Sequence, residues 1–288
     1  MGALNILLQH VLPHHLLSRC VLWLTRIRFR PVKNTITALF VRGFRPDLSD
    51  AVQPDAFAYA NFNEFFTRAL RADARPLAPG SQTLVSPVDG TVSQLGSLRG
   101  HELLQAKGRY YTLDALLAGA AQSWSGRFRE GLFATLYLAP YNYHRIHMPA
   151  DGTLQEIWYV PGRLFSVNAR AAASVTDLFA RNERLVLLFE GACGAFAVIF
   201  VGALNVGSMA TVWHGDVTPR RPRQACALPL PPAGQRFLQR GAEVGRFNMG
   251  STVILLFERD RVSLNARLLA GSTIRMGQEL GQISGNRM

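Results

Sequence analysis

The sequence is poor in cysteine and lacks the motifs that cysteine pairs form. Cys20, Cys193 and Cys226 are odd in number and far apart, and the chain has no Cys-x-x-Cys pair. This spacing indicates neither a disulfide framework nor a zinc ribbon, and a reducing cytoplasm is the simplest setting. The N-terminus also lacks the order of basic start, apolar middle and small-residue cleavage site that is typical of a secretory leader.

Lysine is nearly absent as well. Lys33 and Lys107 are the only lysines in a chain whose formal net charge is +12, so arginine carries nearly all of the positive charge. The planar fork of arginine suits phosphate, either in nucleic acid or in lipid headgroups. No zinc-finger, RNP-type or basic-zipper pattern accompanies these arginines, so we expect no nucleic-acid partner.

Charge is missing from residues 191–213, a run long enough to span a bilayer. The run contains four glycines and breaks at LNVGS, which is typical of a turn between two strands. We therefore expect two buried strands there and no transmembrane helix.

Residues 1–58 differ in character from the rest of the chain. Leucine, valine and tryptophan recur at helical spacing on both sides of Pro13, and the first 50 residues carry seven Arg or Lys against Asp47 and Asp50. An apolar face beside an arginine-rich face is typical of a helix that lies in a membrane interface. A helix that packs on the core with a solvated basic side is the alternative. Charge bias and tryptophan favour an amphipathic, helical membrane-association segment.

The remaining residues, 59–288, predict an α+β fold with a mostly antiparallel β core and a few helices. Short apolar runs recur beyond residue 83, from TLVSPVDGTV to STVILLFERD, and Gly, Pro, Asp or Asn separates them. Asn61 followed by Glu64 resembles a capping box that starts a short helix. Thr112 is the expected cap of another helix at 112–119.

Three polar sites lie in predicted turns at strand ends. They are Asp89 in SPVDG, the pair His144 and His147 in APYNYHRIHMP, and the Gly250-Ser251 junction before the strand STVILLFE. Each has a purely structural explanation as a turn. Two histidines three residues apart suit a metal only with further ligands, and no cysteine lies near them, so we expect no metal.

Together these sites supply a carboxylate, a base and a hydroxyl. A serine hydroxyl is a weak nucleophile until a histidine removes its proton, and that histidine needs a carboxylate to hold its tautomer. Asp89, His147 and Ser251 therefore form a candidate triad. A membrane-associated serine hydrolase would use the same residues, although no G-x-S-x-G elbow is present. A lipid-binding protein without catalysis is a further alternative.

The sequence resembles the pyruvoyl-dependent phosphatidylserine decarboxylases of the prokaryotic type. The resemblance spans about residues 60–288, and the Gly-Ser-Thr junction with the histidine block is its most specific part. The family usually has leucine before Gly250, where this chain has Met249, an apolar residue of similar volume. The matching stretches are FFTRALRADARPL (65–77), SPVDGTV (86–92), YNYHRIHMP (141–149), PGRLFSVN (161–168), NERLVLLFE (182–190), VGALNVGSMATVW (201–213) and FNMGSTVILLF (247–257).

The resemblance implies a proenzyme that cuts itself between Gly250 and Ser251. His147, oriented by Asp89, would deprotonate Ser251 for attack on the Gly250 carbonyl. Ser251 would become a covalent pyruvoyl group, the only cofactor implied. The products would be a β chain, 1–250, and an α chain, 251–288, which stay together as a heterodimer, and a homodimer of this pair is left open.

The resemblance also implies the reaction. The pyruvoyl ketone would condense with the amine of phosphatidylserine, and loss of CO2 would give phosphatidylethanolamine. His144 is the candidate for returning a proton to the substrate, and its alternative role is to cap the turn. Arg163, Phe165 and Ser166 are candidates for the lipid site, where Arg163 either faces phosphate or carboxylate or is structural. A lipid substrate predicts a peripheral protein on the anionic, cytoplasmic face of the cell membrane.

Overall fold

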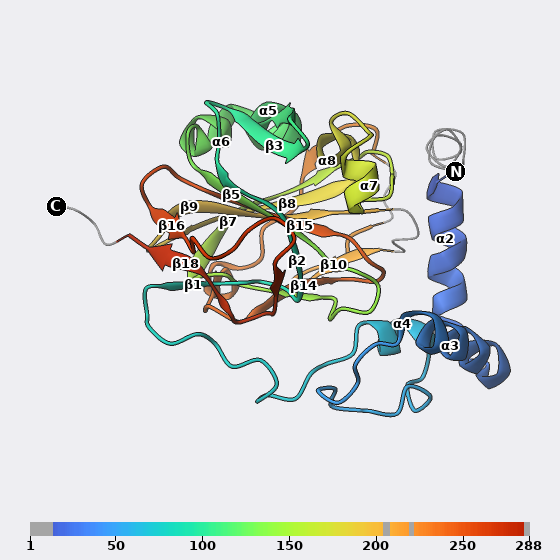
Figure 1. The fold of residues 1–288 in the computed structure, drawn as a ribbon. Helices are drawn as coiled ribbons and strands as arrows, with labels where there is room; N and C mark the ends of the chain where they lie inside the picture. The colour runs from blue at the N-terminus through green and yellow to red at the C-terminus, as the bar shows by residue number, and fades with distance from the viewer. Residues whose placement is uncertain (1–13, 204–207, 219–221, 285–288) are drawn as a thin grey trace.

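The computed structural model describes residues 14–203, 208–218 and 222–284. A nine-stranded antiparallel sheet forms its centre (Figure 1). The strand order is β12 (Cys226–Ala227), β7 (Gly152–Val160), β8 (Arg184–Gly191), β9 (Gly194–Val201), β15 (Thr252–Phe257), β5 (Leu132–Tyr137), β2 (Gly90–Ser97) and β17 (Thr273–Ile274), and β13 (Phe237–Leu238) also pairs with β7.

Strand β15 lies in the middle of this sheet. It pairs with β9 on one side, from Thr252 opposite Val201, and with β5 on the other, from Thr252 opposite Tyr137. All six of its residues are buried, as expected for an uninterrupted apolar run that is covered on both faces. The strand predicted from STVILLFE is confirmed.

Three smaller antiparallel sheets surround the central one. In the four-stranded sheet, β14 lies between β10 and β6, so β6 with His147 is next to the strand that leads to the Gly250-Ser251 junction. The four-stranded sheet contains β11 (Gly215–Asp216), β10 (Met209–Thr211), β14 (Glu243–Phe247) and β6 (Arg145–His147). The others are β1 (Thr83–Val85), β18 (Glu279–Ile283) and β16 (Val262–Leu264), and the hairpin β3 (Glu102–Ala106) with β4 (Arg109–Thr112).

The predicted α+β class is confirmed, because short helices lie around these sheets. The Thr112 hydroxyl accepts a hydrogen bond from Ala115 N and caps α5 as expected. Asn61 caps α4, because its Oδ1 accepts a hydrogen bond from Glu64 N. The Glu64 carboxylate in turn accepts from the side-chain amide of Asn61, and not from its backbone N–H as in a capping box. The helices are α4 (Phe62–Phe66), α5 (Leu113–Leu117), α6 (Ala121–Phe128), α7 (Ala169–Ala172) and α8 (Leu178–Arg181), with 3-10 turns η1 (Ala118–Ala120) and η2 (Ala233–Gln235).

The uncharged run 191–213 forms strands. It contains the end of β8, all of β9 and β10, so the expectation of buried strands is confirmed. The predicted turn at 204–208 falls mostly outside the described residues. Within the described part of the chain, no helix is both long enough and apolar enough to cross a membrane.

Two helices precede the β core, α2 (His14–Thr25) and α3 (Arg30–Phe44), and Figure 1 shows both at one side of it. Phe40 of α3 packs against Phe62, Phe65 and Phe66 in a small cluster of its own. Trp23 and Leu39, by contrast, point to solvent and are 71% and 68% exposed. The segment thus combines a core-packing face with exposed apolar side chains. The part of the predicted helical segment before residue 14 lies outside the described residues.

Candidate active site

The Gly250-Ser251 junction lies where the chain passes from β14 in the four-stranded sheet to β15 in the central sheet. Ser251 is fully buried, and its Oγ has no hydrogen-bond partner among the described residues. Its carbonyl oxygen accepts a 2.9 Å hydrogen bond from Leu138 N, which fixes the start of β15. A buried hydroxyl without a partner is costly to fold, and a catalytic role is one of the explanations for such a group.

His144 lies directly beside this junction. A methyl group added at Gly250 would be 3.5 Å from His144 Nε2 and 3.4 Å from the Leu138 oxygen. Nδ1 lies 2.8 Å from the Asn142 carbonyl oxygen, which can only accept, so Nδ1 carries the proton and Nε2 keeps its lone pair. Nε2 has no hydrogen-bond partner among the described residues. The imidazole therefore presents a free base to the junction.

Burial also keeps this imidazole neutral. Loss of solvent lowers the pKa of His144 to about 3, against a smaller raising effect of the Asn142 hydrogen bond. An unfolded histidine titrates near 6.5, so between about pH 6.5 and 3 the unfolded chain binds the proton that the folded chain rejects. The contribution of His144 to the free energy of unfolding is therefore fully present above about pH 6.5 and is lost as the pH falls toward 3.

We expect the Ser251→Ala chain to lose about 1.4 kcal/mol of unfolding free energy per pH unit from His144 alone as pH falls from 6 to 4. Urea unfolding at each pH measures this slope. His144→Gln, which cannot take up a proton, is the matched variant and should reduce the slope by about one proton. An unchanged slope in that variant would contradict the buried, neutral state of His144.

His147, on β6, is held by two hydrogen bonds. Its Nδ1 donates to the Gly241 carbonyl oxygen at 2.8 Å, and its Nε2 accepts from the Tyr143 hydroxyl at 2.9 Å. Burial raises the pKa of Tyr143, so its hydroxyl keeps the proton that it donates. Burial lowers the pKa of His147, whereas its bond to Gly241 and the charges of Glu243 and Asp89 act in the opposite direction. His147 is thus a neutral imidazole whose Nε2 is an acceptor.

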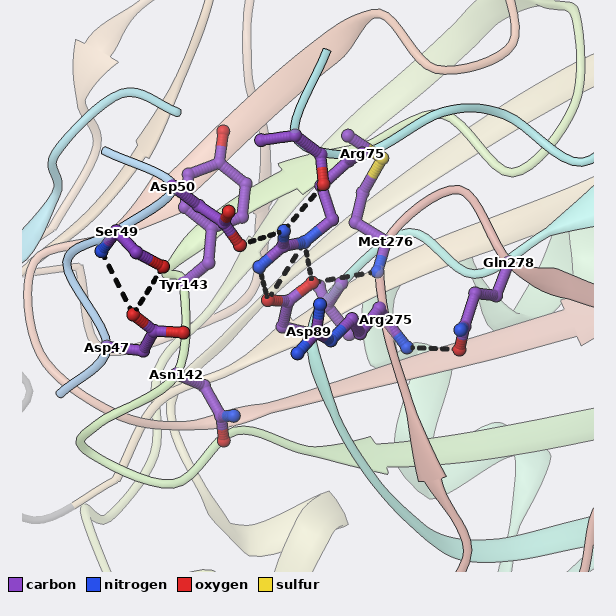
Figure 2. Close-up of polar contacts among 12 residues, drawn as sticks. Asp47, Ser49, Asp50, Arg75, Asp89, Asn142, Tyr143, Arg275, Met276 and Gln278 are labelled. Atoms are coloured by element: carbon purple, nitrogen blue, oxygen red, sulfur yellow. Dashed lines mark hydrogen bonds and ion pairs between the residues drawn. The ribbon is translucent and has the colours of Figure 1, made fainter. Parts of the chain in front are cut away.

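Asp89 is held by an arginine that the sequence analysis missed (Figure 2). Arg75 Nε lies 3.0 and 3.2 Å from the two Asp89 oxygens, and Arg75 Nη2 lies 2.7 Å from one of them. The Met276 amide donates to the same carboxylate at 2.8 Å. Arg75 Nη1 binds Asp50 at 2.7 Å, and these bonds raise the pKa of Arg75. A bidentate pair of this kind fixes the position and orientation of the Asp89 carboxylate.

The structure therefore places the predicted residues in two groups. His144, Gly250 and Ser251 are together at the junction, whereas Asp89 and His147 have partners of their own in Arg75 and Tyr143. Among the described residues no hydrogen bond joins Asp89 to His147, or His147 to Ser251. The triad remains a prediction that needs His147 to exchange Tyr143 for Ser251.

A cavity of about 360 Å³ opens at the junction. It is mostly apolar, and α3, α4, the 137–140 segment and the 166–168 loop form its walls. Ser166 is part of its lining, Phe165 is buried beneath the Arg181 guanidinium, and Arg163 is exposed away from the cavity lining. The lining residues are Phe40, Phe44, Phe66, Tyr137, Leu138, Pro140, Ser166, Val167, Asn168, Ala203, Met249 and Gly250.

Asn182 fixes the loop that forms one wall of this cavity. Its Oδ1 accepts from Phe165 N at 3.1 Å, and its Nδ2 donates to the carbonyls of Phe165 and Gly202 at 2.9 and 2.8 Å. Asn182 lies within a stretch that resembles the family, but the sequence does not reveal its partners. No three His, Cys, Asp or Glu side chains are grouped as a metal site in the described parts of the chain.

Comparison with known proteins gives a consistent result over nearly the whole chain. A family model described as phosphatidylserine decarboxylase matches residues 62–282, and a second model, described as PSD, matches residues 4–45. This chain belongs to the phosphatidylserine decarboxylase family. The resemblance inferred from the sequence is confirmed, and with it the class of enzyme.

Individual relatives carry the same family name. A phosphatidylserine decarboxylase proenzyme of Azotobacter vinelandii is 50% identical over 286 residues, which cover 98% of each chain. Proenzymes of Ectopseudomonas mendocina and Bordetella avium are each 48% identical, and the matches cover 96% and 94% of this chain and 97% and 92% of the relatives. Each of these three relatives is named as a proenzyme, that is, as a precursor.

Proposed function

We propose that the protein decarboxylates phosphatidylserine to phosphatidylethanolamine and CO2, with a pyruvoyl group that it makes from Ser251 by cutting its own Gly250-Ser251 bond. The observation that carries this proposal is the buried, unpartnered Ser251 hydroxyl directly after a glycine, at the head of the central strand and beside an apolar cavity. The precursor names of the relatives support it.

Self-cleavage begins with Ser251. His147, with its charge balanced by Asp89, takes the hydroxyl proton, and Ser251 Oγ attacks the carbonyl carbon of Gly250. The acyl group moves from nitrogen to oxygen and forms an ester. Elimination of the Gly250 carboxylate leaves dehydroalanine, and hydrolysis of this group releases ammonia and gives the pyruvoyl ketone. Arg75 keeps the Asp89 carboxylate in place throughout.

The two chains of the product, 1–250 and 251–288, stay associated in this account. Strand β15 belongs to the smaller chain, but both of its neighbours, β5 and β9, belong to the larger one. Breaking the bond before Ser251 leaves these two ladders of hydrogen bonds intact. The membrane-association segment 1–58 and the catalytic part 59–288 would then act as one assembly.

The pyruvoyl group supplies a carbonyl that draws electrons from the substrate as CO2 leaves. The residues around it supply orientation and proton transfer. His144, whose Nε2 faces the junction, is our candidate for returning a proton to the carbon that has lost CO2. The apolar cavity excludes water, and we assign Ser166, one of the polar residues on its wall with Tyr137 and Asn168, to contact with the headgroup. Phe165 is buried behind this wall and supports it. Arg163 is absent from the cavity lining, and its backbone hydrogen bonds to Arg181 and Glu183 favour a structural role.

An assay with phosphatidylserine vesicles tests the proposal. Wild type is expected to form phosphatidylethanolamine and CO2, and Ser251→Ala is expected to form neither. A serine hydrolase that used the same three residues would instead release fatty acid and react at Ser251 with a fluorophosphonate probe. Ethanolamine lipid formed at equal rates by both proteins would contradict a role for Ser251.

The exposed apolar residues of α2 and α3 support docking on a membrane surface, which we assign to the cytoplasmic face of the cell membrane. We expect Trp23→Gln combined with Leu39→Gln to weaken partitioning onto anionic vesicles several-fold, because each change removes apolar area from the contact. Leu269→Gln is the matched control, since Leu269 is 67% exposed on the β core. Co-sedimentation with vesicles measures the effect, and equal partitioning of all proteins would rule out this docking surface.

A further inference from the structure

A second cavity, of about 250 Å³, lies next to the candidate active site. Three chain segments separate the two: Phe44, Phe66 and Pro140 line the first cavity, whereas Arg45, Arg68 and Tyr141 line the second. Four arginines and three aspartates line the second cavity, and we call it the arginine cavity (Figure 2 shows part of it). These residues are Arg45, Arg68, Arg75, Arg275, Asp47, Asp50 and Asp89.

The aspartates of this cavity already have partners. Asp50 and Asp89 both bind Arg75. Asp47 accepts hydrogen bonds from the backbone nitrogen and the hydroxyl of Ser49, at 2.9 and 2.7 Å. The remaining arginines, 45, 68 and 275, form no ion pair with any carboxylate among the described residues.

Arg68 is the unusual member of this group. Its side chain is only 3% exposed, yet Nε and Nη1 have no hydrogen-bond partner within the described part of the chain. Its other contacts are weak, a 3.4 Å bond from Nη2 to the Asp47 carbonyl and a position 5.7 Å from the Phe65 ring centre. Burial lowers the pKa of Arg68. Burying an unpaired guanidinium is costly, so this site favours an anion.

We propose that the arginine cavity binds a phosphate group, with Arg68 as its principal ligand and Arg45 and Arg275 completing the site. The guanidinium fork matches two phosphate oxygens, and the four arginines of the lining exceed its three aspartates by one positive charge. The volume is below that of ordinary drug-sized pockets, so it accepts a headgroup or a small ion and no acyl chain.

The phosphate has two possible sources with the same chemistry. Arg45 directly follows α3, whose exposed Leu39 belongs to the proposed membrane surface, so the headgroup of an anionic phospholipid is one source. Free phosphate from solution is the other. The site shares Arg75 and Asp89 with the proposed triad but lies outside the cavity at Ser251, so phosphate binding there goes beyond the decarboxylation and does not depend on it.

Thermal unfolding of the full-length protein tests the site. Inorganic phosphate, or dihexanoyl phosphatidylglycerol below its micelle concentration, is expected to raise the unfolding temperature by several degrees above chloride of equal ionic strength. A shift with phosphate identifies the free ion, and a shift with the lipid alone identifies the headgroup. No shift with either would overturn the proposal.

Two variants separate binding from a structural role. Arg68→Met is expected to abolish the shift while keeping or raising the unfolding temperature without ligand, because an unpaired buried charge is removed. A lower unfolding temperature with the shift retained would show a structural arginine and refute the site. Should Arg68→Met fail to fold, Arg275→Gln must weaken the apparent phosphate affinity several-fold, whereas the exposed Arg267→Gln must not.

Discussion

His147→Gln and Asp89→Asn are each expected to slow cleavage of the Gly250-Ser251 bond about 10²- to 10⁴-fold, so that most of the freshly made protein remains uncut. This is the range for loss of a general base or its orienting carboxylate. Glutamine at 147 can still accept from Tyr143 but cannot hold the Ser251 proton. Asparagine at 89 removes the charge that stabilises the imidazolium, although Arg75 still has Asp50 as a partner. Denaturing electrophoresis over time after synthesis measures the cleavage rate.

Controls for this pair of variants come from exposed residues of the same types, His101→Gln and Asp73→Asn. Both should process at the wild-type rate. Unfolding curves must show that the two test variants fold. If folded His147→Gln matures as fast as wild type, His147 is not the base, and His144 would have to act alone at the junction.

The second large effect is expected at His144. His144→Gln should still cut itself but should lose about 10²- to 10⁴-fold in decarboxylation turnover, since proton transfer by a positioned side chain contributes that much. The loss should fall on kcat and leave KM nearly unchanged, because His144 moves a proton and does not hold the headgroup. A processed His144→Gln enzyme with full turnover would show that His144 only supports the turn.

Much of the fold is local in origin and therefore follows from the sequence. The run STVILLFE is too apolar to lie anywhere but in a doubly covered strand, and β15 occupies that position. Thr112 and Asn61 cap their helices because a cap needs only residues within one turn. Glycines in the run 191–213 indicate two strands, observed as β9 and β10, and not a transmembrane helix, for the same reason.

The partners of the site residues come from long-range contacts, which spacing along the chain does not encode. Arg75 is close to Asp89 because the 70s segment and the 273–278 segment meet at the start of β2. Asn182 reaches back to Phe165 across the parallel bridge at Arg163. The sequence likewise contains two histidines in one block. Only the folded chain shows that His144 faces the junction while His147 faces Tyr143.

The lipid-site candidates illustrate the same limit on a smaller scale. Arg163, Phe165 and Ser166 come from one stretch, yet the fold gives them three different environments: exposed, buried and lining the cavity. Side-chain direction in an irregular loop depends on what the loop packs against. Here Asn182 decides it by binding both backbone groups of Phe165.

The central claim is that Ser251 begins a second chain, and the most direct test is the intact mass of freshly purified protein under denaturing conditions. Wild type should separate from 31.8 kDa into a large chain and a small one of about 4 kDa for residues 251–288, lighter than a peptide that begins with serine by the change from amine to ketone. Ser251→Ala should remain one piece. A single wild-type species at 31.8 kDa would contradict the account, and the buried serine would then need another explanation.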